Sequence, residues 1–383
     1  MTLEPAQLRD LINDRLVLLA DPKFRPLESL QEIDAWAHWT EMLANLRQDK
    51  ASFLESYGYG WALDRASYNS CFEAMLQWRL LNALSDIPSD HPALPRCSNV
   101  VVRIVPTSSA RPQLRQVDEY HVIILTSGYL SAFKGFIRLW LRGCAIGEAE
   151  TKHTPTTYGE YAANYFVAIQ KAEAKMATSA LAYVGTLLQL LENQVPLMDG
   201  ESVFDEEVLK SDQWGVMFGL LGTAIDGFLL FHETAHVLAG DSTGNERAID
   251  AEIQADRGSV SLCIIDEARR GGHGTVHLGG PMFFCVELLR LLCEEILEYK
   301  EGRHDPAGGR YPGVEELMLR SGFFGEHIRR FLGPRVHTPY LEWSDAMGLV
   351  FDTVRWALLH SVGNPVSLSQ FVRGPDLGAA RAQ

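Results

Sequence analysis

The sequence predicts an α+β protein that is predominantly α-helical, with a small β-sheet packed on one buried central helix. Three observations support this class. Apolar residues recur at helical spacing over most of the 383 residues, two short β-branched runs are typical of strands, and a long apolar helical segment begins near residue 214. With 46% hydrophobic and 22% charged residues, the composition suffices for a large core.

The N-terminal part, residues 1–94, is predicted to be a helical region that recognises or regulates. Helical spacing occurs in the segments 8–16, 36–43 and 68–84. A turn-rich break at residues 91–95 separates this region from a second domain, residues 95–383, which holds the chemical motifs and C-terminal helices. Composition leaves open whether 1–94 is independent or wraps around the second domain.

The strands are predicted at residues 99–105 and 121–125, joined by a polar stretch that fits a hairpin or a wide loop. The second strand is also a candidate sheet edge for an extended substrate backbone. Further helices are expected at 129–142, 158–193, 214–239, 246–270, 281–300, 313–331 and 341–360, with a loop at 143–157.

Charge and apolar patterning disfavour several partner classes. The formal net charge of −15 disfavours nucleic acid or an anionic membrane surface as the main partner. We expect no signal peptide, and the apolar run 214–231 is interrupted by Asp226, which indicates a core helix rather than a membrane span. Six cysteines without CxxC spacing indicate buried, reduced thiols. We therefore expect a cytoplasmic protein; the sequence does not set its oligomeric state.

The strongest chemical signal is an HExxH motif at residues 232–236. His232 and His236 are one helical turn apart on one face, so their imidazoles can hold a single divalent ion, usually zinc. Glu233, the next residue after His232, is placed to act as general base toward metal-activated water.

A five-residue pattern also arises by chance on surface helices, where the histidines are simply solvated. The context of this motif disfavours that alternative. Twelve uncharged residues, 214–225, precede the motif in the same helix, and apolar Phe231 and Val237 flank it. Burying His, Glu and His without partners is costly, and a metal ion is the simplest partner.

A third ligand is predicted sixteen residues beyond His236, on the following helix. Glu252 and Asp256 are four residues apart and share one helical face. Glu252 is the expected metal ligand, and Asp256 is expected to accept a hydrogen bond from a ligand histidine. Asp241, Glu246 and Asp250 compete for the ligand position.

The HExxH motif followed by Glu252-Ile253-Gln254-Ala255-Asp256 resembles the gluzincin metallopeptidases. It is similar to the soluble phage-exclusion (Lit-type) peptidases and, more distantly, to the CAAX-prenyl and heat-shock membrane proteases. Segments 121–130 and 311–320, the latter with Tyr311 and Arg320, are weaker similarities. The resemblance implies a zincin-like peptidase core, bound Zn²⁺ and a protein or peptide substrate, and its phage-exclusion members imply a role in phage defence.

A group that stabilises the oxyanion is less well defined by the sequence. Tyr311 is the first choice, because it stands where the resembled families have a histidine. The other candidates are His304, His273, His277, His337 and Tyr340.

The sequence thus predicts a cytoplasmic zinc endopeptidase. Two alternatives remain open. One is a zinc-stapled binding or regulatory protein without catalysis, and the other is a metallohydrolase of a non-peptide amide or ester.

Overall fold

A computed structural model of the protein describes residues 68–97, 99–105, 113–117, 120–191, 212–241, 248–269, 275–300, 312–363 and 366–372. In the first half of the chain the elements are α4 (Tyr68–Ser85), the 3-10 helix η2 (Leu94–Cys97), β1 (Val100–Val105), β2 (Gln113–Val117), β3 (Tyr120–Thr126), α5 (Ser127–Thr151), α6 (Tyr158–Lys171) and α7 (Glu173–Leu191). In the second half they are α9 (Asp212–Ala239), α10 (Ile249–Arg269), α11 (Gly279–Lys300), α12 (Pro312–Leu332), α13 (Pro334–Ser361) and α14 (Leu368–Phe371).

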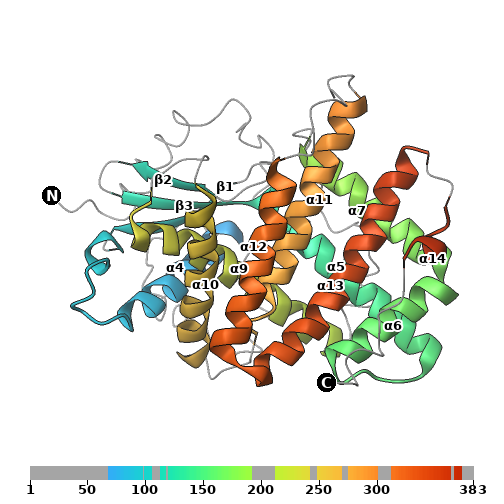
Figure 1. The fold of residues 1–383 in the computed structure, drawn as a ribbon, viewed down its shortest axis with the longest axis horizontal. Coiled ribbons are helices and arrows are strands. Elements are labelled where there is room, and N and C mark those ends of the chain that lie inside the picture. Colours follow the sequence, from blue (N-terminus) through green and yellow to red (C-terminus); the bar gives the residue numbers. More distant parts are fainter. Residues whose placement is uncertain are drawn as a thin grey trace.

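These elements confirm a mostly helical protein with a small sheet. The sheet lies at one end of the molecule beside α4, α9 and α10, while α6, α7, α13 and α14 gather toward the opposite end (Figure 1). The predicted helices at 8–16 and 36–43 lie outside the described residues. Of the predicted N-terminal region, the described α4 packs on β1, α9 and α10, and its Leu76 and Leu80 belong to the common core.

The sheet has the strand order β1-β3-β2. β3 pairs in parallel with β1, placing Val102 beside Ile123, and pairs antiparallel with β2, placing Leu114 beside the same residue. The predicted strands at 99–105 and 121–125 are confirmed, and β2 is an additional strand. Its sequence, QLRQV, carries only one large apolar residue before its terminal valine, so its alternation is too weak to indicate a strand.

The proposal that residues 121–125 form a sheet edge for substrate is wrong. β3 is the central strand, and from His121 to Ile124 it is paired on both sides. Its backbone groups there are already used in the ladder, so no further strand can add to them.

Helix α5 continues nine residues beyond its predicted end and replaces the first part of the predicted loop at 143–157. Gly143 and Gly147 suggested a break, yet both lie inside the helix and serve packing. A Cβ at Gly143 would overlap the ring of Tyr165, and one at Gly147 would overlap the backbone of Asn164. These glycines therefore let α6 approach α5 closely.

The single helix expected at 158–193 is two helices, α6 and α7. They are separated at Ala172, whose φ of −128° and ψ of 36° lie outside the helical region. No proline or glycine marks this position, so the apolar periodicity alone gives no sign of the break.

Helix α13 begins seven residues earlier than predicted, at Pro334, and continues through Pro339.

Helix α9 is the central helix of the fold and confirms the predicted helix at 214–239. It contacts α5, α10, α11 and the strand β3, and every residue from Ala224 to Val237 is buried. This buried segment includes the motif itself, whereas residues 215–220 of the preceding uncharged run are exposed or half-buried.

In the described part of the chain, Gln213–Ala239 is the one helix long and apolar enough to cross a membrane by length and composition. A core helix meets the same criterion, and 56% of the most apolar window is buried inside the protein. The packing of α9 against other helices and β3 accounts for this apolar character.

Close approach of α9 and α10 depends on one glycine. A Cβ at Gly258 of α10 would lie 2.7 Å from the Cβ of Ala235, a residue within the HExxH motif. Real side chains do not pack at this distance, so any larger residue at 258 must push the two helices apart.

Gly258→Leu is therefore expected to lower the free energy of unfolding by about 1–3 kcal/mol, the usual cost of overpacking. Urea unfolding followed by circular dichroism measures the change. Gly219→Leu in α9 is the matched control, because nothing lies within 4 Å of a Cβ there. The control should be unchanged or more stable by up to about 1 kcal/mol, since leucine favours helix over glycine. Equal stability of both variants would contradict the proposed close contact.

Candidate metal centre

The C-terminal half of α9 presents two imidazoles to the protein interior. His232 and His236 are 6% and 0% exposed, and their ring centroids are 4.8 Å apart. Four-residue spacing on a helix puts both rings on one face, as the sequence predicts. The Nε2 atoms of the two rings lie 3.2 Å from each other.

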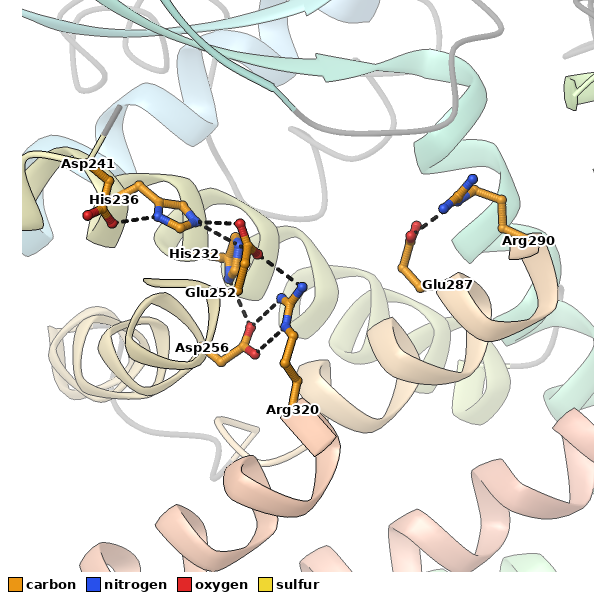
Figure 2. A network of polar contacts seen from close by, with 8 residues as sticks. All are labelled: His232, His236, Asp241, Glu252, Asp256, Glu287, Arg290 and Arg320. Atoms are coloured by element: carbon orange, nitrogen blue, oxygen red, sulfur yellow. Dashed lines mark hydrogen bonds and ion pairs between the residues drawn. The ribbon is translucent and has the colours of Figure 1, made fainter. Parts of the chain in front are cut away.

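Helix α10 packs along α9 and adds a carboxylate between these rings. Oε2 of Glu252 lies 3.3 Å from Nε2 of His232, and Oε1 lies 3.4 Å from Nε2 of His236. The side chain of Glu252 is 15% exposed, more than either histidine. The three residues form a group of potential metal ligands (Figure 2).

The spacing of these donor atoms fits a divalent ion. Zinc bonds of about 2.0–2.1 Å in a tetrahedron separate the ligand atoms by about 3.3–3.4 Å. The 3.2 Å separation of the two Nε2 atoms is close to that edge length, and each Nε2 lies 3.3–3.4 Å from a different oxygen of Glu252. Two imidazoles and one carboxylate are also the donor types that zinc prefers.

Each imidazole has its own carboxylate on the opposite ring nitrogen. Nδ1 of His232 lies 2.9 Å from Oδ1 of Asp256, and Nδ1 of His236 lies 2.9 Å from Oδ2 of Asp241. Carboxylates at Nδ1 favour the tautomer with the proton on that atom, which leaves the Nε2 lone pair for a metal. Asp256 therefore lies where a partner of His232 is predicted, as an ion pair whose alignment is not that of a hydrogen bond.

The partner of His236 is fixed by the end of α9. Gly240 has a φ of +77°, and the amides of Gly240 and Asp241 donate to the carbonyls of Val237 and His236. This left-handed glycine cap turns the chain so that Asp241 lies next to His236. Arg96 of η2 also donates to the carbonyl of Leu238 and so supports the same turn.

Arg320 of α12 neutralises part of the negative charge of the carboxylates around the two imidazoles. Its Nε and Nη2 donate to the two oxygens of Asp256 at 2.8 and 2.9 Å, and its Nη1 is 3.0 Å from Oε2 of Glu252 (Figure 2). An excess of negative charge remains, because one guanidinium faces the three carboxylates of Asp241, Glu252 and Asp256. A bound divalent cation would offset the excess negative charge.

Aromatic rings cover one side of the cluster. Phe228 and Phe283 stack on the ring of His232, with centroids 6.1 Å away in both cases. The guanidinium of Arg320 lies 5.5 Å above the ring of Phe283. This apolar surround strengthens the electrostatic interactions of the buried charges.

The carboxylates perturb the pKa of His232. Burial lowers this pKa, but contacts with Asp256 and Glu252 outweigh it and raise the value to about 9. For Glu252, burial raises the pKa, and the contacts with His232, His236 and Arg320 outweigh it and hold the value far below its usual range. In the metal-free protein, a proton on His232 therefore occupies the position that a metal would take.

Glu233, the predicted general base, is 5% exposed on the same helix. It directly follows His232 in the sequence, and its role as general base stays a prediction. Tyr311, the first choice for the oxyanion, lies outside the described residues, as do Glu246, His273 and His304.

The remaining candidates lie elsewhere. Asp250 is exposed in the first turn of α10 and is not part of the ligand group. His277 is buried, and its ring contacts Tyr158. The ring of Tyr340 stacks on His337 and packs against Phe324.

The sequence predicts the three residues of the ligand group, which the structure brings together, but not two of the groups that contact them. Asp241 was considered only as a ligand, although a Gly-Asp pair directly after the helix is a signal for a cap that returns toward the last turn. The sequence indicates Arg320 only through the weak similarity of segment 311–320 to a metallopeptidase motif. It is 64 residues from Asp256, and no local pattern predicts that contact.

Comparisons of the chain with protein-family models, with curated proteins and with solved structures found no match. The case for a function therefore depends on the residues and geometry of the site.

The pKa of His232 gives a testable pH dependence for metal binding. Because the raised pKa keeps His232 protonated at neutral pH, a metal ion must displace that proton, and affinity should rise about tenfold per pH unit until about pH 9. Calorimetric zinc titrations at pH 7 in buffers of different ionisation enthalpy should report about one proton released per ion. Release of no proton, or an affinity independent of pH between 6 and 9, would contradict this electrostatic description.

Proposed function

We propose that the protein is a zinc-dependent peptidase of the gluzincin type, with His232, His236 and Glu252 as metal ligands. The observation that carries the proposal is the convergence of three ligand side chains: the two Nε2 atoms lie 3.2 Å apart, and each lies 3.3–3.4 Å from one oxygen of the Glu252 carboxylate. Each imidazole is also backed by a carboxylate on its other nitrogen, an arrangement common among zinc-binding histidines.

The number of ligands favours a catalytic over a structural site. Structural zinc is usually enclosed by four protein ligands, whereas catalytic zinc has three and one open position. Among the described residues the ligand group contains His232, His236 and Glu252, and no fourth His, Cys, Asp or Glu joins it.

A divalent ion bound there would polarise a carbonyl group and make a water molecule more acidic. Glu233 supplies the acid–base function: its carboxylate accepts a proton from the attacking water and passes it to the departing amine. Asp241 and Asp256 hold the imidazoles in the tautomer and orientation that binding requires. Arg320 keeps Asp256 ionised for that task.

The substrate and location are part of the proposal. Free thiols at all five cysteines whose side chains are described, Cys97, Cys144, Cys263, Cys285 and Cys293, support a reducing compartment such as the cytoplasm. The resemblance of residues 232–236 and 252–256 to gluzincins supports a zincin-like core and a protein substrate. A role in phage defence follows only from the similarity to phage-exclusion peptidases.

The alternative of a zinc-stapled regulatory protein is favoured by one observation. The site is deeply buried, with His232, Glu233 and His236 all below 7% exposure. Such a protein would bind zinc without hydrolysis, and it would not need Glu233. The behaviour of a Glu233 variant therefore separates the two functions.

Glu233→Gln should retain zinc but lose at least about 100-fold in cleavage rate, because general-base catalysis contributes about 10²–10⁴-fold. The measurement incubates wild type and variant with cell lysate and compares new protein N-termini by mass spectrometry. Metal analysis of both preparations should give about one zinc per chain.

Glu287→Gln in α11 is the matched control, because Glu287 is also a buried glutamate and lies apart from the ligand group (Figure 2). This control should cleave like wild type. If Glu233→Gln also cleaves like wild type, Glu233 is not the base. If wild type and Glu233→Gln both hold zinc and neither of them cleaves, the regulatory alternative is favoured.

A further inference from the structure

Arg320 is a buried arginine that contacts two carboxylates with different proposed roles, the metal ligand Glu252 and the histidine partner Asp256. It is 6% exposed and reaches α10 from α12. Through Nε and Nη2 it holds both oxygens of Asp256, the partner of His232, and through Nη1 it holds Glu252. One rigid guanidinium thus fixes a metal ligand and a ligand's partner relative to each other.

The two oxygens of Glu252 have unequal surroundings. Oε2 lies 3.0 Å from Nη1 of Arg320 and 3.3 Å from His232, whereas the contact of Oε1 is with His236 at 3.4 Å. A carboxylate can bind a metal through one oxygen or through both. A charged hydrogen bond to one oxygen draws electron density from it and fixes the plane of the carboxylate.

We propose that Arg320 is a positioning residue that occupies Oε2 of Glu252 and restricts this ligand to binding through a single oxygen. This inference rests on the metal site of the proposed function. Its consequence is that the carboxylate does not take the remaining coordination position, which stays open for water or substrate. Arg320 thereby determines the coordination number of the centre without touching the ion.

The neighbouring groups support this role. The ring of Phe283 beneath the guanidinium and the two hydrogen bonds to Asp256 leave Arg320 little freedom to move away from Glu252.

Cobalt(II) tests the proposal in the full-length chain, because Co²⁺ replaces zinc in N/O sites and its visible absorption depends on coordination number. Four-coordinate Co²⁺ absorbs strongly, and five-coordinate Co²⁺ absorbs several-fold more weakly. Metal-free wild type titrated with Co²⁺ should give the strong spectrum at one ion per chain.

The decisive variant is the double substitution Arg320→Met with Asp256→Asn. Arg320→Met alone leaves the buried Asp256 charge without its partner, which can cost about 3–5 kcal/mol and prevent folding. The double variant removes both charges of that pair and frees Oε2 of Glu252. It should fold and give the weak, five-coordinate spectrum.

Two controls separate this effect from a general loss of structure. Asp256→Asn alone keeps the contact between Arg320 and Glu252, so it should retain the strong spectrum. The double substitution Arg290→Met with Glu287→Gln in α11 removes both charges of another buried ion pair, away from the site (Figure 2), and it should also retain the strong spectrum.

A strong spectrum in the double variant would overturn the proposal, as would a weak spectrum or no cobalt binding in wild type. Failure of the proposed function is distinguishable from these results. A wild type that shows the predicted spectra but cleaves nothing in lysate is not a peptidase, and the role of Arg320 still stands.

Discussion

The structure depends on the contact between α9 and α10, where two imidazoles and several carboxylates meet inside the protein. Nε2 of His232, Nε2 of His236 and the carboxylate of Glu252 are all electron-rich, and they converge within 3.4 Å. Such atoms repel one another unless a cation lies among them. In the metal-free protein a proton on His232 supplies that charge, and a divalent ion can supply it with three bonds at once.

The fold serves to hold this cluster in place. The buried α9 sets the direction of both imidazoles, Gly258 lets α10 approach, and the turn at Gly240 returns Asp241 to His236. Helix α12 contributes Arg320, which joins it electrostatically to α10. Metal binding should therefore stabilise the packing of α9, α10 and α12 as one unit.

Much of this arrangement follows from the sequence because its signals are local. The one-turn spacing of His232 and His236, and of Glu252 and Asp256, fixes which side chains share a face. The uncharged run before the motif predicts burial of α9, and the structure buries its segment 224–237 with the motif, whereas residues 215–220 are exposed or half-buried. The glycine before Asp241 is likewise a local signal, because a left-handed cap at Gly240 turns Asp241 back toward His236.

Other features depend on contacts distant in sequence. Arg320 reaches Asp256 across 64 residues, and Gly147 marks a close helix contact rather than a helix end. The pairing of the sheet is equally non-local, so the central position of β3 did not follow from its composition. Periodicity identifies elements, whereas their partners are set by tertiary packing.

The central claim is that His232, His236 and Glu252 bind one metal ion, and anomalous diffraction at the zinc edge tests it most directly. Crystals of the zinc-loaded protein should show one anomalous peak among the two Nε2 atoms and the Glu252 carboxylate, with bonds of about 2.0–2.2 Å. A peak elsewhere, or direct contact of the two Nε2 atoms in a zinc-saturated crystal without a peak between them, would contradict the account.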